Sequence, residues 1–104
     1  MEYKQTIGGE SSYTGIGLHT GEISTIRFKP AGPEEGIVFI RTDLPGKPEI
    51  PADIDHVVDI SRGTTIGING ATVATIEHVL SAVVGMRIDN IRIEINGPEA
   101  PVAD

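Results

Sequence analysis

The sequence of 104 residues contains no cysteine, which excludes disulfide bonds and thiolate metal sites. Basic residues are also few: eight Lys and Arg stand against 15 Asp and Glu, and the formal net charge is -7 at pH 7. Binding to nucleic acid is therefore not expected, because phosphate contacts need clustered Lys and Arg. The length suits one domain with a single modest core.

Long apolar runs are missing as well. No stretch approaches the roughly 18 apolar residues of a membrane span, so no transmembrane segment is expected. The first ten residues, MEYKQTIGGE, lack the basic flank and apolar run of a secretory signal peptide. These absences predict a soluble protein with cytoplasmic localisation.

Alternation of polar and apolar residues predicts strands in the first half of the chain. Residues 3–18 alternate loosely and indicate one or two strands interrupted by glycines. Residues 22–42 alternate better around the turn cluster AGPEEG, which predicts a β-hairpin. Residues 44–54 contain three prolines, and each lacks an N–H donor, so a loop or sheet edge is expected there.

The second half combines short strands with one helix. Residues 56–60 and 64–70 are strand candidates, and the NG dipeptide at positions 69 and 70 predicts a hairpin turn. Residues 90–95 alternate cleanly and predict a half-buried strand, whereas residues 96–104 predict a turn without a further element. This order predicts an α+β fold: a two-layer sandwich of a mostly antiparallel or mixed sheet packed on one or two helices.

The helix is predicted from apolar residues at the i, i+3, i+4, i+7 spacing. They are Ile76, Val79, Leu80, Val83 and Val84. Thr75 fits the N-cap position, and Gly85 fits the end of the helix. Glu77 lies at the border of the apolar stripe, and His78 lies on the opposite face.

The face around His78 carries small residues where an exposed helix usually carries Lys, Glu or Arg. These residues are Ala74, Thr75, Ser81 and Ala82. We expect this face to pack against another domain, a subunit, a ligand or a metal. One interpretation is a non-catalytic binding module that docks a partner through the small-residue helix face.

A second interpretation is metal chemistry, because a Glu beside a metal-binding His can act as general base for water in zinc hydrolases. A catalytic zinc needs three protein ligands and an open position. The chain has three histidines, His19, His56 and His78, which would suffice for a self-contained zinc hydrolase if they converged. The sequence gives no reason for them to converge. His56 is expected to be an exposed strand histidine, and His19 lies in a glycine-rich turn that allows a structural hydrogen bond.

Four stretches resemble, in order and spacing, one enzyme family. They are GIGLHTG, SRGTT, TIEHVLSAVVGMRIDN and GPEAPVAD. Together they resemble the amino-terminal domain of the zinc-dependent UDP-3-O-acyl-N-acetylglucosamine deacetylases of lipid A biosynthesis. The resemblance covers nearly the entire chain.

The resemblance implies two similar domains, each a sheet layered on helices like the second domain of ribosomal protein S5, with the active site between them. Glu77 matches the catalytic glutamate and His78 the single zinc ligand of the first domain. The residues matched to the substrate side are His19, Arg62, Gly63 and Thr64, and Asp104 matches the start of the linker to the second domain.

The same resemblance implies what lies outside this sequence. Residues 1–104 correspond to the amino-terminal domain, and the second domain would supply the remaining zinc ligands, the general acid and the acyl groove. The expected substrate is UDP-3-O-(3-hydroxyacyl)-N-acetylglucosamine, in the lipopolysaccharide pathway of Gram-negative bacteria. The domain alone is expected to be inactive.

Overall fold

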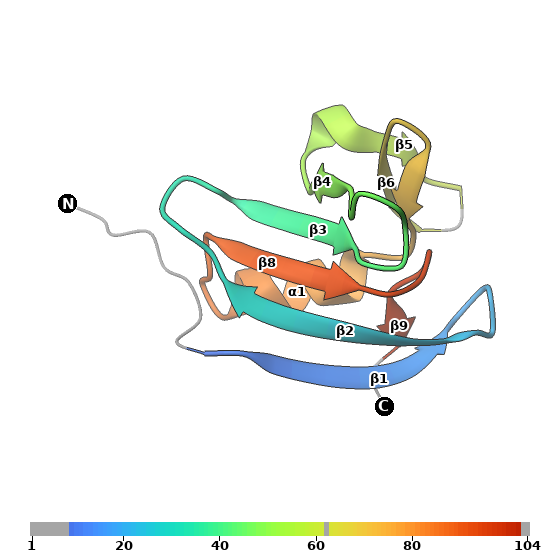
Figure 1. The fold of residues 1–104 in the computed structure, drawn as a ribbon, viewed down its shortest axis with the longest axis horizontal. Helices are drawn as coiled ribbons and strands as arrows, with labels where there is room; N and C mark the ends of the chain where they lie inside the picture. Colours follow the sequence, from blue (N-terminus) through green and yellow to red (C-terminus); the bar gives the residue numbers. More distant parts are fainter. Residues whose placement is uncertain (1–8, 62, 103–104) are drawn as a thin grey trace.

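A computed structural model describes residues 9–61 and 63–102 of the chain. Within these residues the chain forms nine strands, one 3-10 helix and one α-helix (Figure 1). In chain order they are β1 (Ser11–Gly17), β2 (Ile23–Pro30), β3 (Ile37–Arg41), β4 (Glu49–Pro51), η1 (Ile54–His56), β5 (Val57–Asp59), β6 (Thr65–Ile68), β7 (Ala71–Val73), α1 (Glu77–Gly85), β8 (Ile91–Ile95) and β9 (Pro101–Val102).

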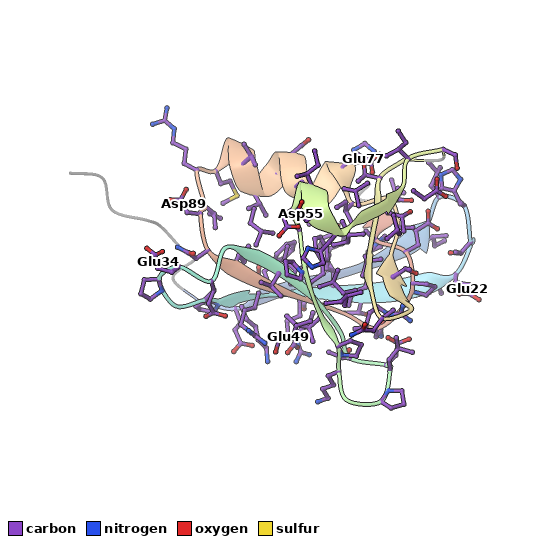
Figure 2. The ribbon with its side chains drawn as sticks, turned by 90° about the horizontal axis from the view of Figure 1, so that it is seen from above. Glu22, Glu34, Glu49, Asp55, Glu77 and Asp89 are labelled. Atoms are coloured by element: carbon purple, nitrogen blue, oxygen red, sulfur yellow. The ribbon has the colours of Figure 1, made fainter. Side chains whose placement is uncertain are left out.

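The strands form two sheets. The larger sheet has the order β4-β3-β8-β2-β1-β9, and the smaller has the order β5-β6-β7. The pair β3-β8 is parallel and the other pairs are antiparallel, so the larger sheet is mixed. Helix α1 covers one face of this sheet, whereas Glu49 lies on its opposite side (Figure 2). The prediction of an α+β fold with a mixed sheet packed on a helix is confirmed.

The core lies between α1 and the larger sheet. The predicted alternation in β8 is confirmed: Ile91, Ile93 and Ile95 are buried, whereas the two residues between them are half-buried. Val79 and Val83 of the helix join them in one hydrophobic cluster. Burial of these side chains fixes α1 on the sheet, since each contributes about 1.5–3 kcal/mol.

The predicted hairpin over residues 22–42 is wrong. Strand β8 lies between β2 and β3, antiparallel to the first and parallel to the second. The reason is that β8 is the most thoroughly apolar alternating strand and therefore takes a central place, although it comes from far along the chain. The first local hairpin is instead β1-β2, and the predicted hairpin at Asn69-Gly70 is confirmed as β6-β7, with φ of 51° and 86° at the turn.

The ends of the larger sheet are edge strands rich in proline. Strand β4 pairs only with β3, which confirms a sheet edge within residues 44–54. The prediction that residues 96–104 form no further element is wrong, because β9 pairs with β1. Pro101 is tolerated there because an edge strand leaves one side without a ladder partner. Residues 103 and 104 lie outside the described part, and so does the predicted linker residue Asp104.

The helix differs from its prediction at two residues. Thr75 is not the N-cap: the helix begins at Glu77 after Ile76, and no side chain caps it. Thr75 instead adopts a left-handed φ of 59° and is buried. Val84, assigned to the apolar stripe, is 65% exposed, whereas Ile76, Val79 and Val83 are buried in the core and Leu80 packs against it. Among the described residues no helix is long and apolar enough to cross a membrane.

Arg41 ties the two sheets together. Its guanidinium is buried and donates to both carboxylate oxygens of Asp43, at 2.9 and 2.8 Å, and to the carbonyl of Thr72 at 2.7 Å. The hydrogen bond from Arg41 holds the pKa of Asp43 below its ordinary value of 3.8, against the opposing effect of burial. Asp43 is therefore ionised at neutral pH.

We expect Arg41→Met to lower the free energy of unfolding by about 2 kcal/mol at pH 7, because it removes the hydrogen bond to the Thr72 carbonyl and the pair with Asp43. The part due to Asp43 should shrink as the pH falls below 3.8, because the depressed pKa stabilises only the ionised carboxylate. Urea denaturation of the chain, with the exposed Arg27→Met as control, measures both effects. An equal loss in the two variants would contradict the role given to Arg41.

Candidate active site

The two residues predicted to carry the chemistry lie at the start of α1. Glu77 is its first residue and His78 its second, and both are exposed. Figure 2 shows Glu77 at the opposite end of the helix from Asp89. Val79 and Val83 of the helix are buried in the core, whereas the glutamate and the histidine are exposed.

Residues 63 and 64 hold the start of the helix. The amide of Thr64 donates to Oε2 of Glu77 at 2.7 Å. The carbonyl of Thr64 accepts from the amide of Ile76 at 3.3 Å. One peptide segment thus fixes both the glutamate carboxylate and the backbone just before the helix.

Gly63 allows this close approach. Its φ is +92°, in the left-handed region that favours glycine, and a Cβ built on it would lie 2.8 Å from Oε2 of Glu77. The structure therefore brings together three residues that the resemblance assigned to the site: Gly63, Thr64 and Glu77. The fourth residue of that region, Arg62, lies outside the described residues.

The imidazole of His78 has no hydrogen bond or ion pair with any residue in the described part of the chain. Its ring nitrogens are therefore open to an external ligand, as the metal prediction requires. A single imidazole supplies one of the three protein ligands of a catalytic zinc. Among residues 9–61 and 63–102 there is no group of three or more His, Cys, Asp or Glu side chains that could hold a metal ion.

His56 does not join this region through any described contact. It ends the 3-10 helix η1 rather than lying in a strand, and its ring is hydrogen-bonded to Asp53. This bond lowers the pKa of Asp53. The described residues therefore give no support to a self-contained zinc site built from three histidines.

His19 lies in the exposed turn between β1 and β2, and its amide donates to both oxygens of Glu99 at 3.0 and 3.1 Å. Oε2 of Glu99 also accepts from the hydroxyl of Thr75 at 2.7 Å. The turn that carries His19 is therefore tied to a residue two positions before Glu77. No hydrogen bond or ion pair joins the His19 ring itself to Glu77 or His78 in the described part of the chain.

Glu99 and Thr75 are the site residues that sequence reasoning missed. Glu99 is 2% exposed and Thr75 is 6% exposed. Burial raises the pKa of Glu99, but hydrogen bonds from Thr75, Thr20 and His19 outweigh it and hold the pKa below its ordinary value of 4.5. Glu99 is thus a buried anion at neutral pH. The sequence around Glu99, with Pro98 before it and Ala100 after it, shows no alternation of polar and apolar residues from which its burial could have been predicted.

We expect Gly63→Ala to displace the Glu77 carboxylate. Where Glu77 acts as the predicted catalytic group, this should lower kcat about tenfold, since small displacements of catalytic groups have large kinetic effects. The new Cβ would push on the Glu77 carboxylate. Gly70→Ala is the matched control, because Gly70 also has a left-handed φ of +86° but nothing within 4 Å of its Cβ position. Equal losses of kcat in the two variants would indicate backbone strain alone and contradict the contact with Glu77.

Comparison with known proteins matches almost the whole chain to one family. The family model described as UDP-3-O-acyl N-acetylglycosamine deacetylase matches residues 4–104. A bifunctional LpxC/FabZ enzyme of Chlorobaculum tepidum is 59% identical over 102 residues, which cover 98% of this chain and 22% of the relative.

Two further relatives are named UDP-3-O-acyl-N-acetylglucosamine deacetylase. The protein of Myxococcus xanthus is 46% identical over 97% of this chain and 32% of its own length. The protein of Citrifermentans bemidjiense is 44% identical over 100% of this chain and 34% of its own length. The chain thus spans between about a fifth and a third of the length of these relatives.

Proposed function

This chain belongs to the UDP-3-O-acyl N-acetylglycosamine deacetylase family, and on that premise we propose that residues 1–104 are the amino-terminal domain of a two-domain deacetylase of lipid A biosynthesis. The observation that carries the proposal is the pair Glu77-His78 at the start of α1. One member is fixed by the Thr64 amide, and the imidazole of the other has no hydrogen bond or ion pair with any described residue. The enzyme would work in the cytoplasm of Gram-negative bacteria.

The proposed reaction is hydrolysis of the N-acetyl amide of UDP-3-O-(3-hydroxyacyl)-N-acetylglucosamine. A water oxygen adds to the amide carbonyl carbon, the carbon–nitrogen bond breaks, and acetate leaves a free glucosamine amine. One proton must leave the attacking water, and one must reach the departing nitrogen. A general base and a general acid are therefore required.

Glu77 is the proposed general base. Its Oε2 accepts the Thr64 amide, and no donor in the described part of the chain contacts Oε1. Oε1 is therefore the oxygen proposed to take the proton from water. The general acid would come from the second domain, as the resemblance to the deacetylase family implies.

His78 is the proposed zinc ligand of this domain. The imidazole is exposed and has no partner among the described residues, which fits this role. The other ligands would come from the second domain, as the resemblance implies, and the described residues hold no three-residue cluster that could replace them. Zinc, when bound, supplies Lewis-acid polarisation of the amide carbonyl. His78 supplies one neutral nitrogen donor and stands next to the base, so the two roles meet at one point.

The substrate side is proposed to include His19, Arg62, Gly63 and Thr64. For Gly63 and Thr64, their close backbone approach to Glu77 supports this assignment. The small residues Ser81 and Ala82 are exposed on the same helix. They would meet the second domain across the cleft. In the proposed enzyme, the partner that docks on this small-residue helix face is therefore the second domain.

The proposal is tested by adding the second domain in trans. We expect the 104-residue chain alone to release no acetate from the substrate, because it lacks most zinc ligands and the general acid. Mixing it with the separately folded carboxy-terminal part should restore acetate release in the presence of zinc. Turnover by the chain alone, or none from a stable complex of both parts, would contradict the proposal.

A further inference from the structure

A buried carboxylate connects two segments that the proposed function places at the active site. Glu99 lies between β8 and β9, and its side chain receives donors from both segments. From the β1-β2 turn come the amides of His19, at 3.0 and 3.1 Å, and of Thr20, at 2.8 Å. The second segment is the one that leads into α1, where the hydroxyl of Thr75 donates to Glu99 at 2.7 Å.

The backbone around Glu99 is tied to the same place. The amide of Ala74 donates to the carbonyl of Pro98 at 2.8 Å, and the amide of Ala100 donates to the carbonyl of Ala74 at 3.0 Å. The carbonyl of Glu99 accepts from the Ser24 hydroxyl at 3.2 Å. Glu99 therefore cannot move without moving the backbone that leads into α1.

The turn approaches Glu99 closely. A Cβ at Gly17 would collide with the Glu99 carboxylate, so only glycine leaves room for the contact. The β1-β2 turn and the Glu99 carboxylate therefore also pack closely, in addition to their hydrogen bonds.

Thr75 is held in a conformation that threonine rarely adopts. A β-branched residue with φ of 59° is a backbone outlier, and such outliers persist only where the surroundings impose them. Its hydroxyl bond to Glu99 is one such constraint. The left-handed turn at Thr75 sets the direction in which the chain enters α1, two residues before Glu77.

From these contacts we infer that Glu99 is a positioning residue, which sets the His19 turn and the Glu77-His78 pair relative to each other without touching substrate. This inference rests on the proposed function. It assigns a carboxylate role separate from the general base: Glu77 exchanges the proton, whereas Glu99 stays an anion that accepts backbone and hydroxyl donors.

The test compares Glu99→Gln and Thr75→Val in the full-length enzyme. Each removes part of the network while keeping the size of the side chain. Both variants should lose about tenfold to 100-fold in kcat with little change in KM, as expected for a misplaced catalytic group. Thr75→Ser keeps the hydroxyl and should recover most of the activity. Glu10→Gln and Thr14→Val are matched controls at exposed positions outside the network.

Two further readouts separate positioning from plain stability. In a Glu77→Gln background, Glu99→Gln should cause a smaller further loss of kcat than in the wild type, because one of the groups it positions is already gone. The N–H of Leu80 bonds to the Ile76 carbonyl at 2.9 Å. Its hydrogen exchange should be faster in Glu99→Gln, and this measures the stability of the first turn of α1 independently of enzyme activity.

The outcomes distinguish the inference from the function on which it rests. A lower melting temperature with unchanged kcat and unchanged Leu80 exchange would overturn the positioning role and leave the proposed function standing. Full multiplication of the two losses in the double variant would also overturn it. Wild-type kcat in Glu77→Gln would instead overturn the proposed function, and the Leu80 exchange would still decide whether Glu99 holds the helix start. If Glu99→Gln fails to fold, Thr75→Val gives the same readouts.

Discussion

Replacing Glu77 by Gln in the full-length enzyme is expected to lower kcat by about 10²–10⁴-fold, the range for loss of a general base. The amide of glutamine cannot take a proton from water near neutral pH, although it has nearly the same shape. Its oxygen can still accept the Thr64 amide, so the fold at the start of α1 should persist. KM should change little, because the interaction lost is one made in the transition state.

Steady-state kinetics with circular dichroism measure this expectation, and Glu10→Gln is the matched control. Glu10 is a suitable control because it is exposed just before β1, at the opposite end of that strand from the turn that carries His19. A normal kcat in Glu77→Gln would remove the proposed chemistry from this helix. It would favour the interpretation of the chain as a non-catalytic docking module.

Replacing His78 by Ala is expected to abolish measurable deacetylation and to weaken zinc binding to the full-length enzyme by more than 100-fold. Removing residues that only support zinc ligands costs about 10–100-fold in affinity, and loss of a direct ligand should cost more. The fold should be unaffected, because the exposed imidazole has no hydrogen-bond partner in the described part of the chain.

Zinc titration by calorimetry measures this expectation, and His56→Ala serves as the matched control because His56 is bonded to Asp53 in η1. The 104-residue chain alone should bind zinc weakly, since it offers one imidazole at the site. Tight one-to-one binding by the chain alone, lost in His78→Ala, would show a complete metal site within these residues. The division of the ligands between two domains would then be wrong.

Local sequence patterns predicted the local features of this fold well. The alternation of Ile91, Ile93 and Ile95 predicted a half-buried strand, and Asn69-Gly70 predicted the β6-β7 turn. Both signals depend on residues close together in the sequence. The α+β class followed from the order of such elements, and the structure confirms it.

Long-range pairing could not be predicted in the same way. Residues 22–42 contain two strands and a turn, which is the local signature of a hairpin, yet β8 enters between them. That choice depends on burying an isoleucine-rich strand in the middle of the sheet. Strand β9 is likewise defined only by its pairing with β1, and two residues with one proline carry no strand signal of their own.

In the candidate site, too, the local features could be predicted from the sequence and the long-range contacts could not. The adjacency of Glu77 and His78 is visible in the sequence, and helical periodicity placed them off the apolar stripe. The contact between Thr64 and Glu77 joins residues 13 positions apart, and the contact between Glu99 and His19 joins residues 80 positions apart. Thr75 was predicted to be a helix cap because threonine often is one, but the Glu99 carboxylate captures its hydroxyl.

The central claim is that this domain brings one zinc ligand and the adjacent base to a shared active site. Zinc-edge anomalous diffraction from crystals of the full-length enzyme tests it most directly. The account predicts an anomalous peak about 2.0–2.1 Å from a ring nitrogen of His78, with the remaining ligands from outside residues 1–104 and with Glu77 beside the metal but not bound to it. A zinc peak coordinated without His78 would contradict the account.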